Sequence, residues 1–216
     1  MTISLQEILP IPLRDKPRLK QSEVWNKQVE FNAGEWVKIK APSGTGKTTL
    51  VHIIWQLRTD FTGTVLYDKT NACNIKANEI ANYRQQKMSV IFQDMRLFGN
   101  LTAFENIELK RTMAAKPFYD VTMINEMAAS LGVQQILHQK ASTCSYGEQQ
   151  RIAIIRALMQ PFTWLIMDEP FSHLDKENTS KAAALIAAEC KKRNAGFILT
   201  DLDDDSHFTY TKQFLL

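Results

Sequence analysis

The chain has 216 residues, of which 44% are hydrophobic, so it is long enough to bury the core of one domain, alone or with a subdomain. Its 26 basic and 23 acidic residues leave a net charge of +3, which gives no general reason to expect nucleic acid or an anionic membrane surface as a partner. We expect no signal peptide and no membrane-spanning segment, and the 3 scattered cysteines indicate reduced thiols in a cytosolic compartment rather than a zinc site.

The first half of the chain is predicted to run from strands through a glycine-rich loop into a helix. Residues 24–40 are rich in β-branched and aromatic residues and break at residues 32–34, which predicts two short strands around a turn. The spacing of the apolar residues that follow predicts a helix that begins near Lys47. Residues 63–68 and 88–92 are further predicted strands.

The second half is predicted to alternate helices with short apolar strands. Helical spacing covers residues 97–141, 152–160 and 176–196, and the last two helices are closed by Pro161 and Gly196. The predicted strands are 162–167 and 197–200. Because these strands are short and wholly apolar, we expect a parallel sheet that is covered by helices on both faces.

The stretch APSGTGKT, residues 41–48, fits the phosphate-loop pattern G-x-x-x-x-G-K-[ST], except that Ala41 stands at the first glycine. Small residues suit this loop because backbone amides must approach the phosphates closely, while Lys47 would reach the β- and γ-phosphates and Thr48 would bind Mg²⁺. The alternative is an incidental glycine loop, but this one lies between a predicted strand and a predicted helix, as phosphate binding requires. The predicted nucleotide-binding residues here are Ser43, Gly44, Thr45, Gly46, Lys47, Thr48 and Thr49.

Two adjacent carboxylates follow the apolar strand in FTWLIMDEP, residues 162–170. Asp168 could hold Mg²⁺ through water, and Glu169 could polarise an attacking water. The alternative is a polar strand end at an ordinary loop. A phosphate loop elsewhere in the same chain favours the catalytic interpretation.

A helix start lies in CSYGEQQR, residues 144–151, where Ser145 and Glu148 have the spacing of a capping box. The amides of such a helix start could also bind a phosphate. The pattern by itself is compatible with both roles.

Six elements in this order resemble those of the ATP-binding cassette (ABC) ATPases. They are APSGTGKT, Gln93 in VIFQD, a helical segment at about 97–143, CSYGEQQR, LIMDEP, and FSHLD, which ends at Asp175. The resemblance covers nearly the whole chain and implies a single α/β domain of the P-loop NTPase (RecA-like) type, with a mostly parallel sheet, a small antiparallel β subdomain and a helical insert. The core would span about 1–96 and 152–216, and the helical subdomain about 97–151.

The resemblance also implies the ligands and the roles of the site residues. ATP and Mg²⁺ are the expected ligands. The expected catalytic residues are Glu169, Gln93 and Asp175, and the expected Mg²⁺ ligands are Thr48, Gln93 and Asp168. Ser145 and Gly147 are expected to contact the γ-phosphate of ATP held by a second cassette.

The segments IFQDMRLFGNLTAFENIELK and SYGEQQRIAIIRAL are similar to the bacterial branch that serves lipoprotein release, cell division and macrolide or peptide export. We therefore expect an ATP-hydrolysing subunit that pairs with itself or with another cassette and drives separate transmembrane permease subunits from the inner face of the cytoplasmic membrane. Leu97 or Phe98 could dock a helix of that partner. No nucleic acid is expected. The alternatives are a low-turnover regulatory cassette and a soluble ABC ATPase that acts on nucleic acid or ribosomes.

Several further features depart from the family pattern. Residues 1–24 contain no aromatic side chain to stack on adenine, which leaves Arg14 or the Pro12 region as candidates for that contact. Cys144 replaces a leucine and Tyr146 replaces a glycine. Asp201 stands where the family has a histidine that contacts the γ-phosphate, so we expect slow hydrolysis unless His173 or His207 substitutes.

Overall fold

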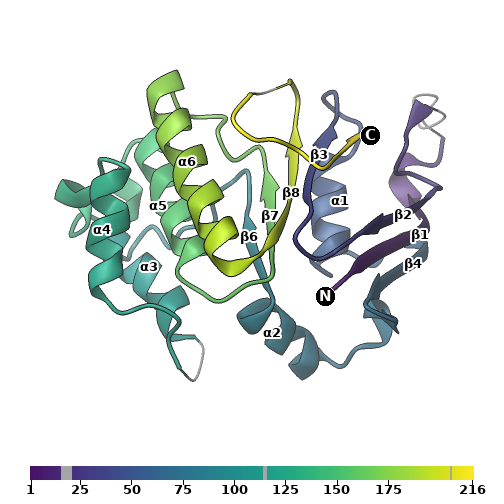
Figure 1. Ribbon diagram of the computed structural model, residues 1–216, viewed down its shortest axis with the longest axis horizontal. Helices are drawn as coiled ribbons and strands as arrows, with labels where there is room; N and C mark the ends of the chain where they lie inside the picture. The colour runs from purple at the N-terminus through teal and green to yellow at the C-terminus, as the bar shows by residue number, and fades with distance from the viewer. Residues whose placement is uncertain (16–20, 114–115, 205) are drawn as a thin grey trace.

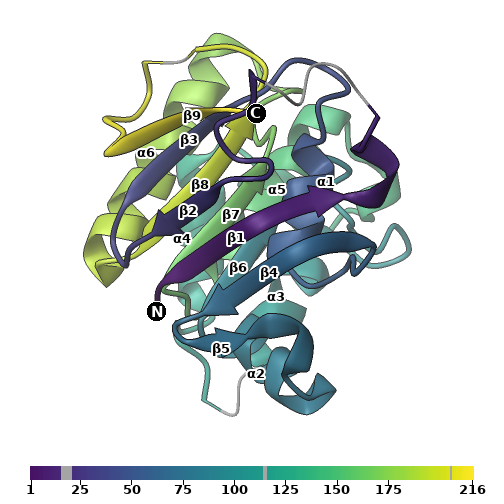
Figure 2. The same ribbon diagram turned by 90° about the vertical axis from the view of Figure 1, so that its right-hand side faces the viewer.

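Two β-sheets form the centre of the fold, and helices pack against both faces of the larger one (Figures 1 and 2). This computed structural model describes residues 1–15, 21–113, 116–204 and 206–216, so residues 114 and 115 of the predicted helical segment lie outside the description. The strands are β1 Ile3–Pro10, β2 Gln28–Phe31, β3 Trp36–Lys40, β4 Phe61–Tyr67, β5 Thr70–Asn71, β6 Met88–Ile91, β7 Trp164–Asp168, β8 Gly196–Asp201 and β9 Lys212–Leu215. The α-helices are α1 Lys47–Ile54, α2 Ala77–Gln86, α3 Ala103–Thr112, α4 Thr122–Ser130, α5 Tyr146–Leu158 and α6 Lys176–Arg193.

The larger sheet has the strand order β6-β7-β8-β3-β9, and every neighbouring pair in it is parallel. In Figure 1 the helices α5 and α6 lie on one side of this sheet, and α1 lies on the other side, facing the antiparallel sheet β2-β1-β4-β5. The expected parallel sheet with helices on both faces is thus confirmed. All five residues of β7 are buried, which explains why this strand is a continuous apolar run in the sequence.

The core has two parts, one on each face of the parallel sheet. Leu165 and Met167 of β7 belong to the cluster beneath α4, α5 and α6, whereas Trp164 and Ile166 belong to the cluster around α1 and the antiparallel sheet. Alternate residues of a strand point to opposite faces, so this one strand is packed from both sides. Among the described residues, every helix is too short or too polar to span a membrane.

The predicted end of the last long helix is wrong. Helix α6 ends at Arg193, and its C-cap is Asn194, which adopts the left-handed conformation with φ of 50°. Gly196 is instead the first residue of β8. A Cβ at Gly196 would lie 2.7 Å from the carbonyl oxygen of Glu35 and 2.8 Å from the ring of Trp164, so this glycine serves close packing. Asparagine tolerates the left-handed conformation better than most residues, which explains its place at the helix end.

Two strands at the ends of the chain were not predicted. Strand β1 lies inside the antiparallel sheet, between β2 and β4, and β9 is the edge strand beside β3. The alternation of β1 is interrupted because its pairing with β4 shifts register between Gln6 and Leu9, around Glu7, whose φ is 52°. Such a bulge interrupts the alternation of apolar and polar residues from which a strand is predicted.

Candidate functional site

The carboxyl ends of the parallel strands bring four segments of the chain together. Lys40 of β3 is opposite Asp201 of β8, Asp168 of β7 is opposite Thr200, and Ile91 of β6 is opposite Met167. Because parallel strands end at the same edge of a sheet, the residues that follow them must be neighbours. The loop after β3 is the predicted phosphate loop, the carboxylates end β7, and Gln93 follows β6.

The loop of residues 41–46 has the backbone shape that its glycines permit. Gly44 and Gly46 have φ of 78° and 106°, and Gly46 is the N-cap of α1. A Cβ at Gly46 would lie 2.7 Å from Leu13 and 3.1 Å from the ring of Trp25, so a larger residue would not fit. Ala41 is buried and is not among the described residues with positive φ, so alanine is accommodated where the pattern has a glycine.

Two predicted site residues, Lys47 and Gln93, contact a third, Glu169, beside this loop. The Nζ of Lys47 lies 3.2 Å from Oε1 of Glu169 and donates to the carbonyl oxygen of Ala41 at 2.9 Å. The Nε2 of Gln93 donates to Oε2 of Glu169 at 3.1 Å. Glu169 itself has φ of 46°, a conformation that costs a non-glycine residue about 1 kcal/mol, and its amide donates to the carbonyl oxygen of Thr200.

Asp168 is fully buried, and its two carboxylate oxygens differ in their surroundings. Its Oδ1 accepts a hydrogen bond from the hydroxyl of Thr200 at 2.7 Å, whereas Oδ2 has no hydrogen-bond partner within the described part of the chain. A buried carboxylate oxygen without a partner is costly, and a water bound to Mg²⁺ would satisfy it. No group of three or more His, Cys, Asp or Glu side chains that could hold a metal forms among the described residues, so a cation here would depend on neutral oxygen ligands, phosphates and water for its other ligands. Oxygen ligands of this kind suit Mg²⁺.

The predicted capping box is present at the start of α5. The hydroxyl of Ser145 accepts from the amide of Glu148, and the Glu148 carboxylate accepts from the amide of Ser145 at 2.8 Å. Tyr146 is 68% exposed and keeps an ordinary negative φ, which answers how a bulky residue can replace a glycine there. Its ring stacks on His173, with the ring centroids 5.4 Å apart. A Cβ at Gly147 would lie 3.0 Å from the carbonyl oxygen of His173.

Gln150 is a polar residue of this region that the sequence analysis did not single out. It is fully buried on α5, where Nε2 donates to the carbonyl oxygen of Glu169 at 3.3 Å and Oε1 accepts from the amide of His173 at 2.9 Å. It therefore ties the start of α5 to the loop after β7. A glutamine on the apolar face of an amphipathic helix, one turn before Ile154, is the signal that could have indicated it.

Asp175 is the N-cap of α6. Its Oδ1 accepts from the amide of Asn178 at 2.8 Å, and Oδ2 accepts from the Asn178 side chain at 2.9 Å. The hydrogen bond from the backbone of Asn178 lowers the pKa of this carboxyl below its usual value. The structure thus shows a capping role for Asp175, and its catalytic role stays a prediction.

Asp201 lies beside the phosphate loop, because its carbonyl oxygen accepts from the amide of Ala41 at 2.9 Å. Its own Oδ1 accepts from the amide of Leu202 at 2.7 Å. His207 packs its ring against Phe171, with centroids 6.0 Å apart, while His173 is held by Tyr146 and Gln150. The contacts of both histidines are thus with Phe171, Tyr146 and Gln150, and a role of either one at the γ-phosphate stays a prediction.

Trp25 is the first aromatic residue of the chain, but it lies under the phosphate loop. It is 1% exposed, and its Nε1 donates to the carbonyl oxygen of Thr45 at 3.1 Å. Its ring is therefore not available to a base from solution. Ile11, in the 3₁₀ turn Ile11–Leu13 at the end of β1, is 50% exposed and lies next to Pro12.

The family model and the relatives that match this chain describe the same kind of protein. A family model described as ABC transporter matches residues 25–172. The ABC transporter ATP-binding protein YxdL of Bacillus subtilis is 33% identical over 156 residues, which cover 71% of this chain and 61% of that protein. The lipoprotein-releasing system ATP-binding protein LolD of Bacteroides fragilis is 30% identical over 177 residues, which cover 82% of each protein.

Solved structures resemble the fold closely. The dimeric structure of MJ0796, described as a bacterial ABC transporter cassette, superposes with a TM-score of 0.80 at 25% identity, covering 93% of this chain and 88% of that one. The post-hydrolysis state of the same cassette, bound to ADP and Pi, gives a TM-score of 0.75.

Proposed function

The chain belongs to the ABC transporter family of ATP-binding cassettes, and we propose that it is the ATP-hydrolysing subunit of a membrane complex. The expected family, the α/β fold and the resemblance to lipoprotein-release cassettes are confirmed by these relatives and structures.

The convergence of Lys47 and Gln93 on Glu169 carries the proposal for the site. The ammonium of Lys47 would bind the β- and γ-phosphates of ATP, and the loop amides would bind the same oxygens. Glu169 would then orient and polarise the attacking water. Mg²⁺, held by Thr48, Gln93 and Asp168, would neutralise charge on the phosphates.

A second cassette would complete the site. Ser145 and Tyr146 are exposed at the start of α5, and this helix start offers amides and a positive dipole to a phosphate. Gly147 stays small because the carbonyl of His173 lies against it. We propose that Ser145 and Gly147 contact the γ-phosphate held by the other cassette, identical or not, and that Asp175 acts at the same interface.

The partner would be a transmembrane permease that holds the chain at the inner face of the cytoplasmic membrane. Support comes from exposed apolar side chains before, on and just after α3, where Phe98, Leu109 and Met113 are 57%, 42% and 49% exposed. In this proposal, residues about 97–151 form the helical subdomain that meets the partner. Residues about 1–96 and 152–216 form the nucleotide-binding core of the same domain.

The first test is capture of the partner. The tagged chain is extracted from its own host in mild detergent, and stoichiometric partners are identified by mass spectrometry. An integral membrane protein is the expected result, whereas only soluble partners would contradict the proposal.

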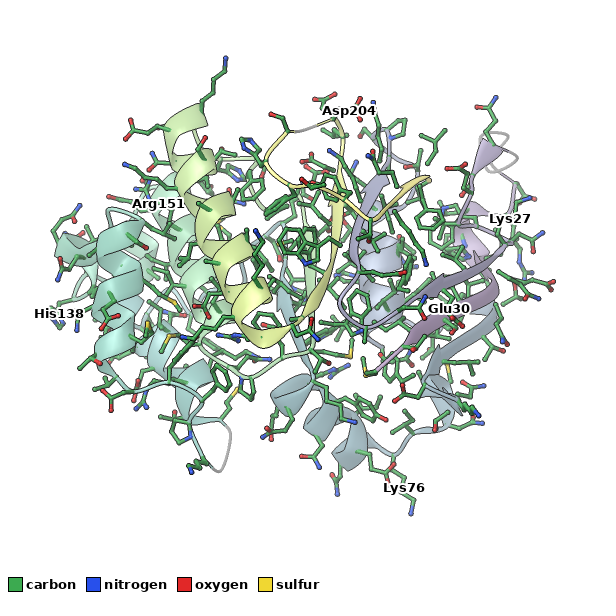
Figure 3. The ribbon with its side chains drawn as sticks, in the orientation of Figure 1. Lys27, Glu30, Lys76, His138, Arg151 and Asp204 are labelled. Carbon is green, nitrogen blue, oxygen red and sulfur yellow. The ribbon has the colours of Figure 1, made fainter. Side chains whose placement is uncertain are left out.

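A second test addresses the nucleotide. Lys47→Ala should abolish binding of a fluorescent ATP analogue, because the loop loses its only side-chain cation for the phosphates. Lys76→Ala, at an exposed position just before α2 that is labelled at the bottom of Figure 3, is the matched control. Unchanged affinity in Lys47→Ala would contradict the assignment of the loop.

One observation favours a low-turnover regulatory cassette as the second candidate. Asp201 lies beside the phosphate loop, where its carboxylate would oppose a triphosphate. Rates of ATP hydrolysis with and without the captured membrane protein distinguish the two functions, since only the transport subunit should be stimulated.

A further inference from the structure

The indole of Trp25 forms a hydrogen bond with the phosphate loop from its buried side. The ring is 1% exposed, and Nε1 donates to the carbonyl oxygen of Thr45 at 3.1 Å. A buried indole N–H needs an acceptor, and Trp164, which is also fully buried, donates instead to the carbonyl oxygen of Met1 at 2.8 Å. Trp25 therefore meets a general requirement with an atom of the loop that is predicted to bind phosphates.

This hydrogen bond fixes the direction of one peptide group, the one that joins Thr45 to Gly46. The described peptide bonds are trans, so the carbonyl and the amide of this group point in opposite directions. Because the Thr45 carbonyl points at the buried indole, the Gly46 amide points away from it. Within the described part of the chain this amide donates no hydrogen bond, so it is available to a phosphate oxygen.

The rest of the loop does not fix this peptide group. The amide and the hydroxyl of Thr45 both donate to the carbonyl oxygen of Pro42, at 3.3 and 2.8 Å, which holds only the preceding side of the residue. Among the described residues, Trp25 is the only hydrogen-bond donor to the Thr45 carbonyl. Gly46 has φ of 106°, and a glycine adopts positive and negative φ about equally well, so the peptide group can rotate.

Loss of the indole N–H would favour that rotation. Thr45 is 9% exposed, and a buried carbonyl without a partner is costly. Rotation would turn the carbonyl outward to water and the Gly46 amide inward, away from a phosphate. The hydrogen bond from Trp25 thus selects the orientation that suits an anion.

The segment that carries Trp25 is anchored independently of the loop. The Ser22 hydroxyl accepts from the amides of Val24 and Trp25 at 3.1 and 2.8 Å. The Glu23 amide donates to the carbonyl oxygen of Leu215 on β9, and the Leu215 amide donates to Oε2 of Glu23 at 2.7 Å. The indole can therefore orient the loop, since its own position does not depend on the loop.

We propose that Trp25 is a positioning residue for nucleotide binding: its indole holds the Thr45 carbonyl beneath the phosphate loop and thereby presents the Gly46 amide to the phosphates. This inference rests on the proposed function, because it requires a nucleotide in the loop. Trp25 acts through the backbone and does not touch the nucleotide.

The test measures the affinity of the full chain for ATP and ADP by isothermal titration calorimetry. Trp25→Phe keeps an aromatic ring but loses the donor, so it should raise the dissociation constants of both nucleotides about tenfold. Its KM for ATP should rise by a similar factor while kcat at saturating ATP changes less than about twofold, because Trp25 supports binding and not the chemical step.

Trp164→Phe is the matched control. It removes the same kind of hydrogen bond from an equally buried indole, but at the start of β7, whereas Asp168 of the site lies at the end of that strand. Its affinity for ATP should equal that of the wild type. Equal losses of affinity in the two variants would overturn the inference, because general destabilisation would then explain both.

The Gly46 amide can be observed directly by nuclear magnetic resonance. The sequence contains Thr-Gly only at residues 45–46 and 62–63, so carbonyl-¹³C threonine with ¹⁵N glycine gives two correlated amide signals. Thr62→Ser removes the Gly63 signal and so assigns the pair. Saturating ADP should shift the Gly46 signal downfield in the wild type and less in Trp25→Phe, while Gly63 on β4 stays unchanged. An equal shift of Gly46 in both forms would overturn the proposal.

The outcomes separate this inference from the function beneath it. If the wild type binds ATP and Trp25→Phe binds it as tightly, the inference is overturned while the proposed function stands. If the wild type binds no nucleotide, both are overturned. If Trp25→Phe does not fold, Ser22→Ala decides, because it keeps the indole but releases its backbone. That variant should raise the dissociation constant of ATP about threefold, and an unchanged value would overturn the inference.

Discussion

The ammonium of Lys47 and the carboxylate of Glu169 form an ion pair with Nζ 3.2 Å from Oε1, and both side chains are nearly buried, at 7% and 11% exposure. The lysine expected to bind phosphates is therefore paired with the carboxylate expected to activate water. Phosphate oxygens would compete with Glu169 for the same ammonium. Binding of ATP would then release Glu169 for water while Gln93 still donates to it.

Glu169→Gln should keep ATP binding and lower turnover by at least about a hundredfold, because an amide cannot act as a general base. Its affinity for ATP should equal or exceed that of the wild type, since the competing charge is gone. Size-exclusion chromatography with light scattering should find an ATP-bound dimer at saturating MgATP. Glu177→Gln, an exposed position on α6, is the control. A monomeric Glu169→Gln protein would contradict the composite site.

Asp201→His should raise the basal rate of ATP hydrolysis several-fold. The backbone of residue 201 is hydrogen-bonded to Ala41, so its side chain lies at the edge of the phosphate loop, where a histidine can donate to a phosphate that a carboxylate repels. Steady-state phosphate release measures the effect, with Asp203→His as the control on the following loop. An unchanged or lower rate would show that Asp201 does not limit turnover.

Gln150→Leu should lower the free energy of unfolding by roughly 1–2 kcal/mol, because it removes the two hydrogen bonds that join α5 to the carbonyl of Glu169 and the amide of His173. It should also lower the maximal rate of hydrolysis more than ATP affinity, since Gln150 contacts the backbone of Glu169 and not the phosphate loop. Urea denaturation and ATPase kinetics test both effects. Gln149→Leu, on the same helix, is the control, and it should change the rate of hydrolysis and the ATP affinity much less.

Lys110→Met should raise the free energy of unfolding at pH 7 by about 1–2 kcal/mol, because it removes a desolvated charge from the native state. This figure is smaller than the full pKa shift would give, because the side chain is partly exposed and water screens its charge. Folding lowers the pKa of Lys110 from 10.5 to about 8, so below pH 8 the native state holds an unfavourable charge. Between about pH 8 and 10.5 the unfolded chain binds more protons, so the stability of the wild type rises with pH.

The difference in free energy of unfolding between Lys110→Met and the wild type should therefore be smaller at pH 10 than at pH 7. Urea denaturation at the two pH values measures it. A difference that stays constant with pH would show that Lys110 keeps an ordinary pKa in the native state.

Gly196→Ala should destabilise the protein by about 1–3 kcal/mol, because the added methyl overlaps Glu35 and Trp164. Asn194→Gly should change stability by less than about 1 kcal/mol, because glycine adopts the left-handed conformation readily. Thermal denaturation of both variants checks this. Equal losses would contradict the separate roles of the two residues.

Much of the local structure of this protein could be predicted from patterns within short segments of its sequence. A helix start, a phosphate loop and an apolar strand that ends in two carboxylates each depend on residues close together in the chain. For this reason the phosphate loop, the capping box at Ser145 and the parallel sheet could be predicted, and the family resemblance followed from the order of the motifs. The end of α6 could not, because a glycine pattern does not distinguish a helix cap from a site of close packing at Gly196.

Only the tertiary structure decided which side chains meet. The ion pair of Lys47 with Glu169, the stack of Tyr146 on His173 and the hydrogen bonds of Gln150 join residues from different elements. One groove beside the parallel sheet is lined by Arg84, Lys110 and Arg156, which come from α2, α3 and α5. The order of strands in the sheet and the packing of helices on it set these contacts, and no spacing within one element encodes them.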